Sequence, residues 1–215
     1  VGTPYTDSSP AWAPFVAAVE RWRAQGVNID YVWVRTVADI DAQIDAWLSG
    51  TVPRVDYVWT IWGYHVLTDI TNQMIIEDAD GLIARWRARL TPYPATLKTV
   101  LVTKHAASLR YWRDDYHYRH KVMRGDAVFL ASITARLIHD MMQILCACNE
   151  VYYMGDGNNL VFAHAFHIMP AQLQERVTQA LYPASGSDCF ERQYQTTVAL
   201  IDDVLALIPS GVEAQ

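Results

Sequence analysis

Residues 11–25 and 36–49 carry apolar side chains at the three- and four-residue spacing of amphipathic helices. Gly26 follows the first stretch and Gly50 the second, and glycine commonly ends a helix because it accepts a left-handed backbone. Thr36 begins the second stretch, where its hydroxyl can accept a hydrogen bond from the first helical turn. The pattern therefore predicts two helices in the N-terminal part of the chain.

Between and after these predicted helices, the pattern changes to short runs of β-branched and aromatic residues. Residues 27–34 (VNIDYVWV) and 55–62 (VDYVWTIW) have the composition of strands, and residues 73–76 are a third candidate. The sequence EDADG at residues 77–81 closes the third run and has the composition of a turn. The alternation of helices and strands predicts an α/β or α+β layer.

After Pro92 and Pro94 the hydrophobic spacing is helical throughout, and no convincing strand follows. The expected helices span 96–120, 126–153 and 189–207, with another opened by Pro170. We therefore predict an α+β fold in two domains. Residues 1–90 are expected to form a reduced mixed sheet with helices, and residues 91–215 a C-terminal helical bundle.

The composition narrows the class of protein. Of the 215 residues, 52% are hydrophobic and 19% are charged, which is enough for a sizeable core. The net charge of −6 argues against a broad nucleic-acid surface, and no apolar run is long enough to predict a membrane-spanning helix. The three cysteines form no C-x-x-C pair, so reduced thiols and a cytoplasmic location are expected.

The stretch MGDGNN at residues 154–159 raises the question of a phosphate-binding or metal-binding loop. A phosphate loop follows a strand and usually offers a lysine, whereas this stretch follows a predicted helix and contains no lysine. It also lacks the series of oxygen ligands that a calcium loop needs. We therefore predict that Gly155 and Gly157 supply the left-handed backbone that ends the long helix.

Three phrases follow one another in an order that points to a family. Residues 27–34 form a strand-like run with one acidic residue, and residues 74–94 combine the EDADG turn with a helix. Residues 124–156 begin with RGD, continue as a long apolar helix and end with NEVYYMGD. Together these phrases resemble the small-molecule nucleotidyltransferases of the DNA polymerase beta superfamily, in the branch of the kanamycin and lincosamide enzymes. The resemblance covers residues 26–183.

The resemblance implies a nucleotidyltransferase-like mixed sheet ahead of the helical bundle. It also implies the transfer of a nucleoside monophosphate from ATP or another nucleoside triphosphate to a hydroxyl of a small-molecule acceptor, with magnesium (Mg²⁺). In such reactions carboxylates hold the metal ions at the attacking and leaving oxygens. Asp30 matches the family's third carboxylate and is therefore the expected catalytic residue and metal ligand. Because members of the family often dimerise, a homodimer is expected.

One element of the family pattern is missing from the sequence. No Gly-Ser turn followed by Asp-x-Asp precedes Asp30, and the nearest match, around Asp7, has Ser9 where a second aspartate is needed. Two explanations remain open. The chain is part of a longer or split product, which the start at Val1 favours, or it is a catalytically silent relative that serves as a binding or assembly module.

Four further residues are candidates for contacts with the substrates. Lys104 and Arg110 belong to a predicted basic helix and are expected to contact the triphosphate, because both residue types bind phosphate oxygens. Asn149 and Tyr153 are expected to line the wall of a cleft. The long helix also carries a polar stripe that either faces solvent or lines this cleft: Ser132, Arg136, His139, Asp140 and Gln143.

Two histidine pairs remain. His117 and His120 share a helix face, as zinc ligands can, but a solvated or interface face is the preferred interpretation. His164 and His167 repeat the three-residue spacing among apolar neighbours. We expect this second pair to pack within the core or between helices rather than to bind a metal.

Overall fold

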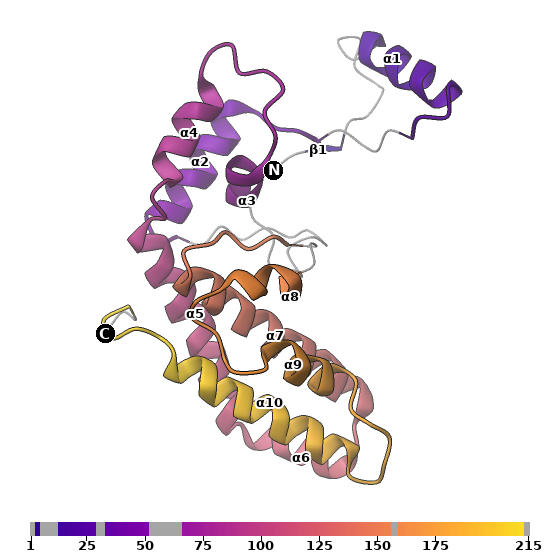
Figure 1. Ribbon diagram of the computed structural model, residues 1–215, viewed down its shortest axis with the longest axis vertical. Coiled ribbons are helices and arrows are strands. Elements are labelled where there is room, and N and C mark those ends of the chain that lie inside the picture. The colour runs from indigo at the N-terminus through magenta and orange to yellow at the C-terminus, as the bar shows by residue number, and fades with distance from the viewer. Residues whose placement is uncertain (1–2, 5–12, 29–32, 52–65, 156–158, 213–215) are drawn as a thin grey trace. The chain divides into compact units, whose positions relative to one another are not determined.

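The computed structural model describes residues 3–4, 13–28, 33–51, 66–155 and 159–212 (Figure 1). The chain divides into two compact units, Val1–Asp45 and Ala46–Gln215, and each is considered by itself. The first unit contains β1 (Thr3–Pro4), α1 (Ala13–Ala24), β2 (Trp33–Val34) and most of α2 (Val37–Leu48).

The two helices predicted for the N-terminal part are present as α1 and α2. Thr36 accepts a hydrogen bond from the amide of Asp39 at 3.1 Å, so it caps α2 as predicted. Ile40 and Ile44 form the buried side of α2 at helical spacing. The strands β1 and β2 pair antiparallel, with Thr3 opposite Val34.

The prediction of a mixed sheet is wrong. The described residues are predominantly helical, and the strand pairing among them is the two-residue ladder of β1 and β2. Residues 73–76 form a loop in which Met74 and Ile76 are exposed to solvent at 87% and 94%. An apolar run of this length needs a partner strand to become part of a sheet, and composition alone does not supply one. Residues 29–32 and the whole of 55–62 lie outside the described residues.

The second unit is built from helices where the structure describes it (Figure 1). Its first helices are α3 (Val66–Asn72), α4 (Leu82–Leu90), α5 (Ala95–Asp114) and α6 (Tyr116–Arg124). They are followed by α7 (Ala127–Cys148), α8 (Asn159–Phe162), the 3-10 helix η3 (Ala163–Ala165), α9 (Leu173–Leu181) and α10 (Cys189–Ala206).

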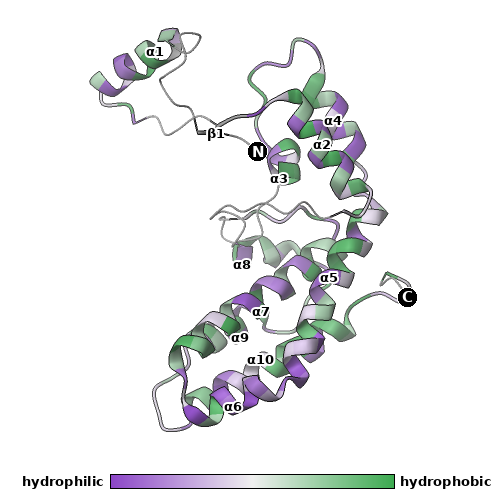
Figure 2. Cartoon of the chain, turned by 180° about the vertical axis from the view of Figure 1, so that it is seen from behind, coloured by the Kyte–Doolittle hydropathy of each residue, from purple (hydrophilic) through white to green (hydrophobic). Residues whose placement is uncertain are grey.

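The core of the second unit lies between α5 and α7, which pack along one another, and α10 packs against both. Figure 2 shows hydrophobic and hydrophilic residues alternating around these helices, as expected for helices with one buried face. The large side chains that are almost fully buried there are Leu97, Leu109, Leu137, Met141, Ile144, Leu145 and Leu200. Burying a side chain of this size stabilises the fold by roughly 1.5–3 kcal/mol.

Helix α7 is, among the described residues, the one helix with the length and apolar composition of a membrane span. More than half of its most apolar stretch is buried inside the protein. The central helix of a helical core has the same composition, because neighbouring helices surround it. The composition of α7 therefore does not by itself point to a membrane.

Two of the phrases that resemble the nucleotidyltransferases also have local structural roles. In RGD, Gly125 ends α6 with a φ of 65°, and Asp126 caps α7 by accepting a hydrogen bond from an amide of its first turn at 3.3 Å. In EDADG, Asp78 accepts hydrogen bonds from the amides of Ile83 (3.1 Å) and Ala84 (3.0 Å) at the start of α4. These bonds lower the pKa of the Asp78 carboxyl below its ordinary value.

The C-terminus of α7 corrects the prediction for the glycine stretch. Glu150, rather than a glycine, adopts the left-handed backbone that ends the helix, with a φ of 58°. The amides of Glu150 and Val151 donate to carbonyls of the last turn at 3.2 and 2.9 Å, which is the bond pair of a Schellman motif. Gly155, with a φ of 64°, lies after a non-helical segment and turns the chain there, and Gly157 lies outside the described residues.

Candidate functional site

A group of polar and ionisable side chains lies where α5 and α7 face each other. We name it the α5/α7 polar cluster, and it consists of Lys104, His105, Ser108, Arg136, His139 and Asp140. Helical spacing brings them together, because residues three and four apart in one helix share a face. The cluster interrupts the apolar contact between the two helices, which makes it the candidate functional site of this unit.

Asp140 is the centre of the cluster and is fully buried. Its Oδ1 accepts a hydrogen bond from His105 Nδ1 at 2.6 Å, and its Oδ2 accepts one from Ser108 Oγ at 2.7 Å. Arg136 Nε lies 3.4 Å from Oδ2. Burial raises the pKa of Asp140, but the hydrogen bond and charge of His105, the Ser108 hydroxyl and the Arg136 charge outweigh it, so the net pKa is lowered. The carboxylate is therefore ionised at neutral pH.

His105 is oriented by this carboxylate. When the ring is neutral, the hydrogen bond to Asp140 places the N–H on Nδ1 and the lone pair on Nε2. The ring is almost completely buried and lies edge-on to the ring of His139, with 6.0 Å between centroids. A carboxylate that fixes a histidine tautomer in this way serves either to position a proton acceptor or to tie two helices together.

His139 is half-buried and stays uncharged at neutral pH. Burial lowers its pKa to about 4, and the charges of His105, Arg136 and Lys104 act in the same direction against the attraction of Asp140. Its ring also lies edge-on to the ring of Tyr153, with 5.5 Å between centroids. His139 is thus a neutral imidazole beside two cationic side chains.

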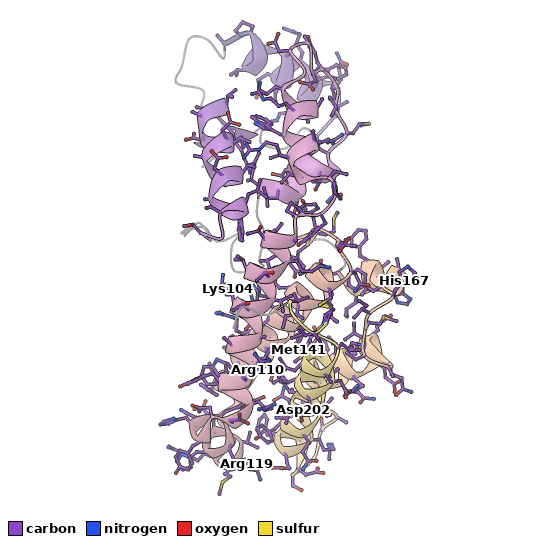
Figure 3. The ribbon with its side chains drawn as sticks, turned by 90° about the vertical axis from the view of Figure 1, so that its left-hand side faces the viewer. Lys104, Arg110, Arg119, Met141, His167 and Asp202 are labelled. Carbon is purple, nitrogen blue, oxygen red and sulfur yellow. The ribbon has the colours of Figure 1, made fainter. Side chains whose placement is uncertain are left out.

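Lys104 and Arg136 form the solvent-facing part of the cluster. The Arg136 side chain is 61% exposed, and Lys104 is exposed on α5, where Figure 3 labels it. Partial desolvation of the ammonium group lowers the pKa of Lys104, and the charge of Arg136 lowers it further. The negative charge of Asp140 acts in the opposite direction and raises this pKa. Within the described part of the chain, Lys104 Nζ makes no hydrogen bond or ion pair.

The segment with Tyr152 and Tyr153 connects the end of α7 to other helices of the unit. Thr68 Oγ1 on α3 donates to the carbonyl of Tyr153 at 2.6 Å, and the hydroxyl of Tyr152 donates to the carbonyl of Leu90 at 2.8 Å. Asn159 Nδ2 donates to the Tyr153 hydroxyl at 3.3 Å. Burial raises the pKa of Tyr153 to about 12, so this hydroxyl is protonated over the whole ordinary pH range.

The predicted substrate-contacting residues are only partly brought together. Lys104 belongs to the cluster, and Tyr153 touches it through His139. Arg110 is exposed on α5, where Figure 3 labels it, and the six residues that separate it from Lys104 place it about 120° around the helix axis, on another face than the cluster. Asp30, the predicted catalytic residue and metal ligand, lies outside the described residues.

Asn149 has a structural role that the sequence reasoning did not identify. Its Nδ2 donates to the carbonyls of Leu145 and Ile168, both at 2.8 Å. Its Oδ1 accepts from the amides of His167 (2.9 Å) and Ile168 (3.0 Å). The amide therefore holds residues 167–168 against the end of α7.

The polar stripe of α7 does not simply face solvent. Asp140 and Gln143 are buried, whereas Ser132 and Arg136 are exposed, so the stripe passes from the surface into the contact with α5. Sequence reasoning missed His105, which binds a partner 35 residues away in the chain. The available signal was Asp140 itself, since an aspartate on an apolar helix face requires a partner.

Neither histidine pair belongs to a metal-binding group formed by the described residues. The His117 side chain is exposed and lies 3.6 Å from Asp115, and His120 stacks on Tyr116 with 5.7 Å between centroids. No group of three or more His, Cys, Asp or Glu side chains that could hold a metal ion occurs in the described ranges. His164 and His167 are exposed, so they do not lie in the core, while His164 Nε2 lies 2.6 Å from Gln174 Oε1 of α9.

Residues 59–156 match a protein family described as a domain of unknown function, DUF4037. The match covers less than half of the 215 residues, and it includes α3 to α7, the whole α5/α7 polar cluster and Tyr153. No curated protein and no solved structure matches the chain. The part of the chain that carries the candidate site is therefore similar to a family whose description names no activity.

Proposed function

We propose that the chain transfers a nucleoside monophosphate from a nucleoside triphosphate to a hydroxyl of a small-molecule acceptor, with magnesium. In this proposal the α5/α7 polar cluster contacts the phosphates. The proposed activity is supported by one observation: two segments that resemble the nucleotidyltransferases contact each other within the second unit. The phrase at residues 74–94 includes α4, and the carbonyl of Leu90 in α4 accepts a hydrogen bond from the hydroxyl of Tyr152. Tyr152 belongs to the phrase at residues 124–156, and both phrases lie in the second unit. The neighbouring Tyr153 touches His139 of the cluster.

The positively charged side chains of the cluster are of the types that bind phosphate groups. Phosphoryl and nucleotidyl transfer depend on positioning and on stabilisation of charge on phosphate oxygens, for which Lys and Arg are the usual side chains. Lys104 and Arg136 supply two positive charges against the single carboxylate of Asp140. Arg110, on another face of α5, is the second phosphate contact that the sequence suggested and remains part of the proposal.

Magnesium, when bound, neutralises charge on the phosphoryl oxygens during transfer. Asp30 is the residue that we propose as its protein ligand.

The direct test is pyrophosphate release by the full chain with magnesium, using ATP and GTP with aminoglycoside and lincosamide acceptors. We expect release with at least one pair of substrates, and a loss of at least a hundredfold in Asp30→Asn. Arg124→Gln, which changes an exposed charge at the end of α6, serves as the matched control. Release that is equal in Asp30→Asn and the unaltered chain would refute the assignment of Asp30.

A second candidate is a binding or assembly module without catalysis. It is favoured by one observation, the lack of a Gly-Ser turn and Asp-x-Asp ahead of Asp30 in this sequence. The two candidates differ in outcome, because the module binds nucleotide or a partner and releases no pyrophosphate with any acceptor.

A further inference from the structure

We propose that Lys104, Arg136 and His139 form a binding site for a phosphate-type anion, and that His139 takes up a proton when the anion binds. The inference rests on the proposed function only for the choice of a phosphate as the ligand. The positive charge and the neutral imidazole are features of the α5/α7 polar cluster itself.

The three side chains are placed on one side of the contact between α5 and α7. Arg136 and His139 are three residues apart on α7 and share a face. Lys104 is four residues from Ser108, whose hydroxyl donates to Asp140, so Lys104 lies on the side of α5 that faces this part of α7. The charges of Arg136 and Lys104 both lower the pKa of His139, and the charge of Arg136 also lowers the pKa of Lys104.

The charge of this group is not balanced within the described residues. Asp140 is its only acidic member, and both oxygens already accept hydrogen bonds from His105 and Ser108. Arg136 turns Nε toward Asp140, while its two terminal nitrogens make no hydrogen bond to a described residue. The terminal nitrogens of Arg136 and the Nζ of Lys104 are therefore available to an anion from solvent.

Proton uptake follows from the position of His139. Burial and the charges of His105, Arg136 and Lys104 hold its pKa at about 4. An anion between Arg136 and Lys104 offsets their charges and adds a negative charge near the ring, so the pKa of His139 rises toward its ordinary value. By linkage, the affinity for the anion then falls by up to about tenfold for each pH unit of increase above pH 4 until the raised pKa is reached.

Two of the other groups that face His139, Asp140 and Tyr153, do not produce the same dependence. The pKa of Asp140 is lowered, so it stays ionised, and the pKa of Tyr153 is raised to about 12, so it stays protonated. His105 lies edge-on to His139, with 6.0 Å between ring centroids, so its contribution to the proton uptake is tested by a His105→Gln variant. Lys104 also faces the site, so its titration must be separated from that of His139 by a variant.

The experiment is a calorimetric titration of the full chain with sodium pyrophosphate, without magnesium or nucleotide, between pH 5.5 and 7.5. Two buffers with different heats of ionisation report the number of protons taken up. We expect uptake approaching one proton at pH 5.5 and an affinity that is lower at pH 7.5 by up to about tenfold. In parallel, the imidazole C2–H resonance of His139, identified by its absence in His139→Gln, should shift toward the protonated position on binding.

Variants assign the parts of the site. Arg136→Gln should weaken binding at least tenfold, Lys104→Gln should weaken it while the His139 resonance still shifts, and Arg124→Gln should leave it unchanged. Circular dichroism confirms that each variant is folded. Absence of pyrophosphate binding, equal affinity in Arg136→Gln, or proton uptake that persists in His139→Gln would overturn the inference.

The proposed function and this inference fail separately. Pyrophosphate binding with proton uptake, but without pyrophosphate release from any nucleotide, keeps the anion site and rejects nucleotidyl transfer. Nucleotidyl transfer that is unaffected in Arg136→Gln and His139→Gln keeps the function and rejects the anion site. A parallel titration with ATP shows whether the site prefers a nucleotide or the free anion.

Discussion

Replacing Asp140 by alanine removes the shared acceptor of two hydrogen bonds in a fully buried position. His105 Nδ1 and Ser108 Oγ, now 2.6 and 2.7 Å from the carboxylate, lose their partner. A hydrogen bond to a charged group contributes about 1.5–3 kcal/mol, and breaking a buried polar pair costs about 3–5 kcal/mol. We therefore expect the free energy of unfolding to fall by about 3–5 kcal/mol and the melting temperature by roughly 10 °C.

The assay is urea unfolding followed by circular dichroism at 222 nm, with Asp202→Ala as the matched control. Asp202 is an exposed aspartate of α10 that lies 3.3 Å from Arg113, and an exposed pair of this kind contributes below about 1 kcal/mol. Asp140→Asn, which keeps one acceptor oxygen, should fall between the two. Equal losses in Asp140→Ala and Asp202→Ala would refute the view that Asp140 is the buried centre of the cluster.

Three further predictions concern single residues. The pKa of His139 is about 4 in the fold against 6.5 ordinarily, so the unfolded chain takes up this proton first as the pH falls. Stability should therefore drop by about 3 kcal/mol between pH 6.5 and 4, and His139→Gln should remove that drop in urea unfolding at each pH. Glu150→Val should lower the free energy of unfolding by about 1–2 kcal/mol, because a β-branched residue is strained at a left-handed backbone, while Glu150→Gly should stay within about 0.5 kcal/mol. Asn149→Ala should accelerate hydrogen exchange at the amides of His167 and Ile168 at least tenfold, whereas unchanged exchange would contradict its bonds to both.

The parts of the fold that depend on local spacing could be predicted from the sequence. The helices α1 and α2, and the capping role of Thr36, follow from periodicity and a short-range hydrogen bond. The strand at 73–76 was wrong because its composition resembles a strand but no partner strand is present there in the described part of the chain. A strand depends on its partner, which composition does not reveal.

The candidate site, too, could be predicted from the sequence only in part. Lys104 and the stripe that contains Arg136, His139 and Asp140 could be identified as polar groups on apolar helices. Their environment could not, because His105 reaches Asp140 only when α5 packs on α7. Similarly, a glutamate rather than a glycine ends α7, because the two Schellman hydrogen bonds and the ion pair of Glu150 with Lys98 at 2.7 Å hold it in the left-handed backbone.

We propose that the α5/α7 polar cluster contacts the phosphates of a nucleoside triphosphate. The most direct measurement is a calorimetric titration of the full chain with ATP and magnesium, repeated for Lys104→Ala and for Arg124→Ala. We expect binding that is at least tenfold weaker in Lys104→Ala and unchanged in Arg124→Ala. Equal binding in all three chains, or no binding of ATP to any of them, would contradict it.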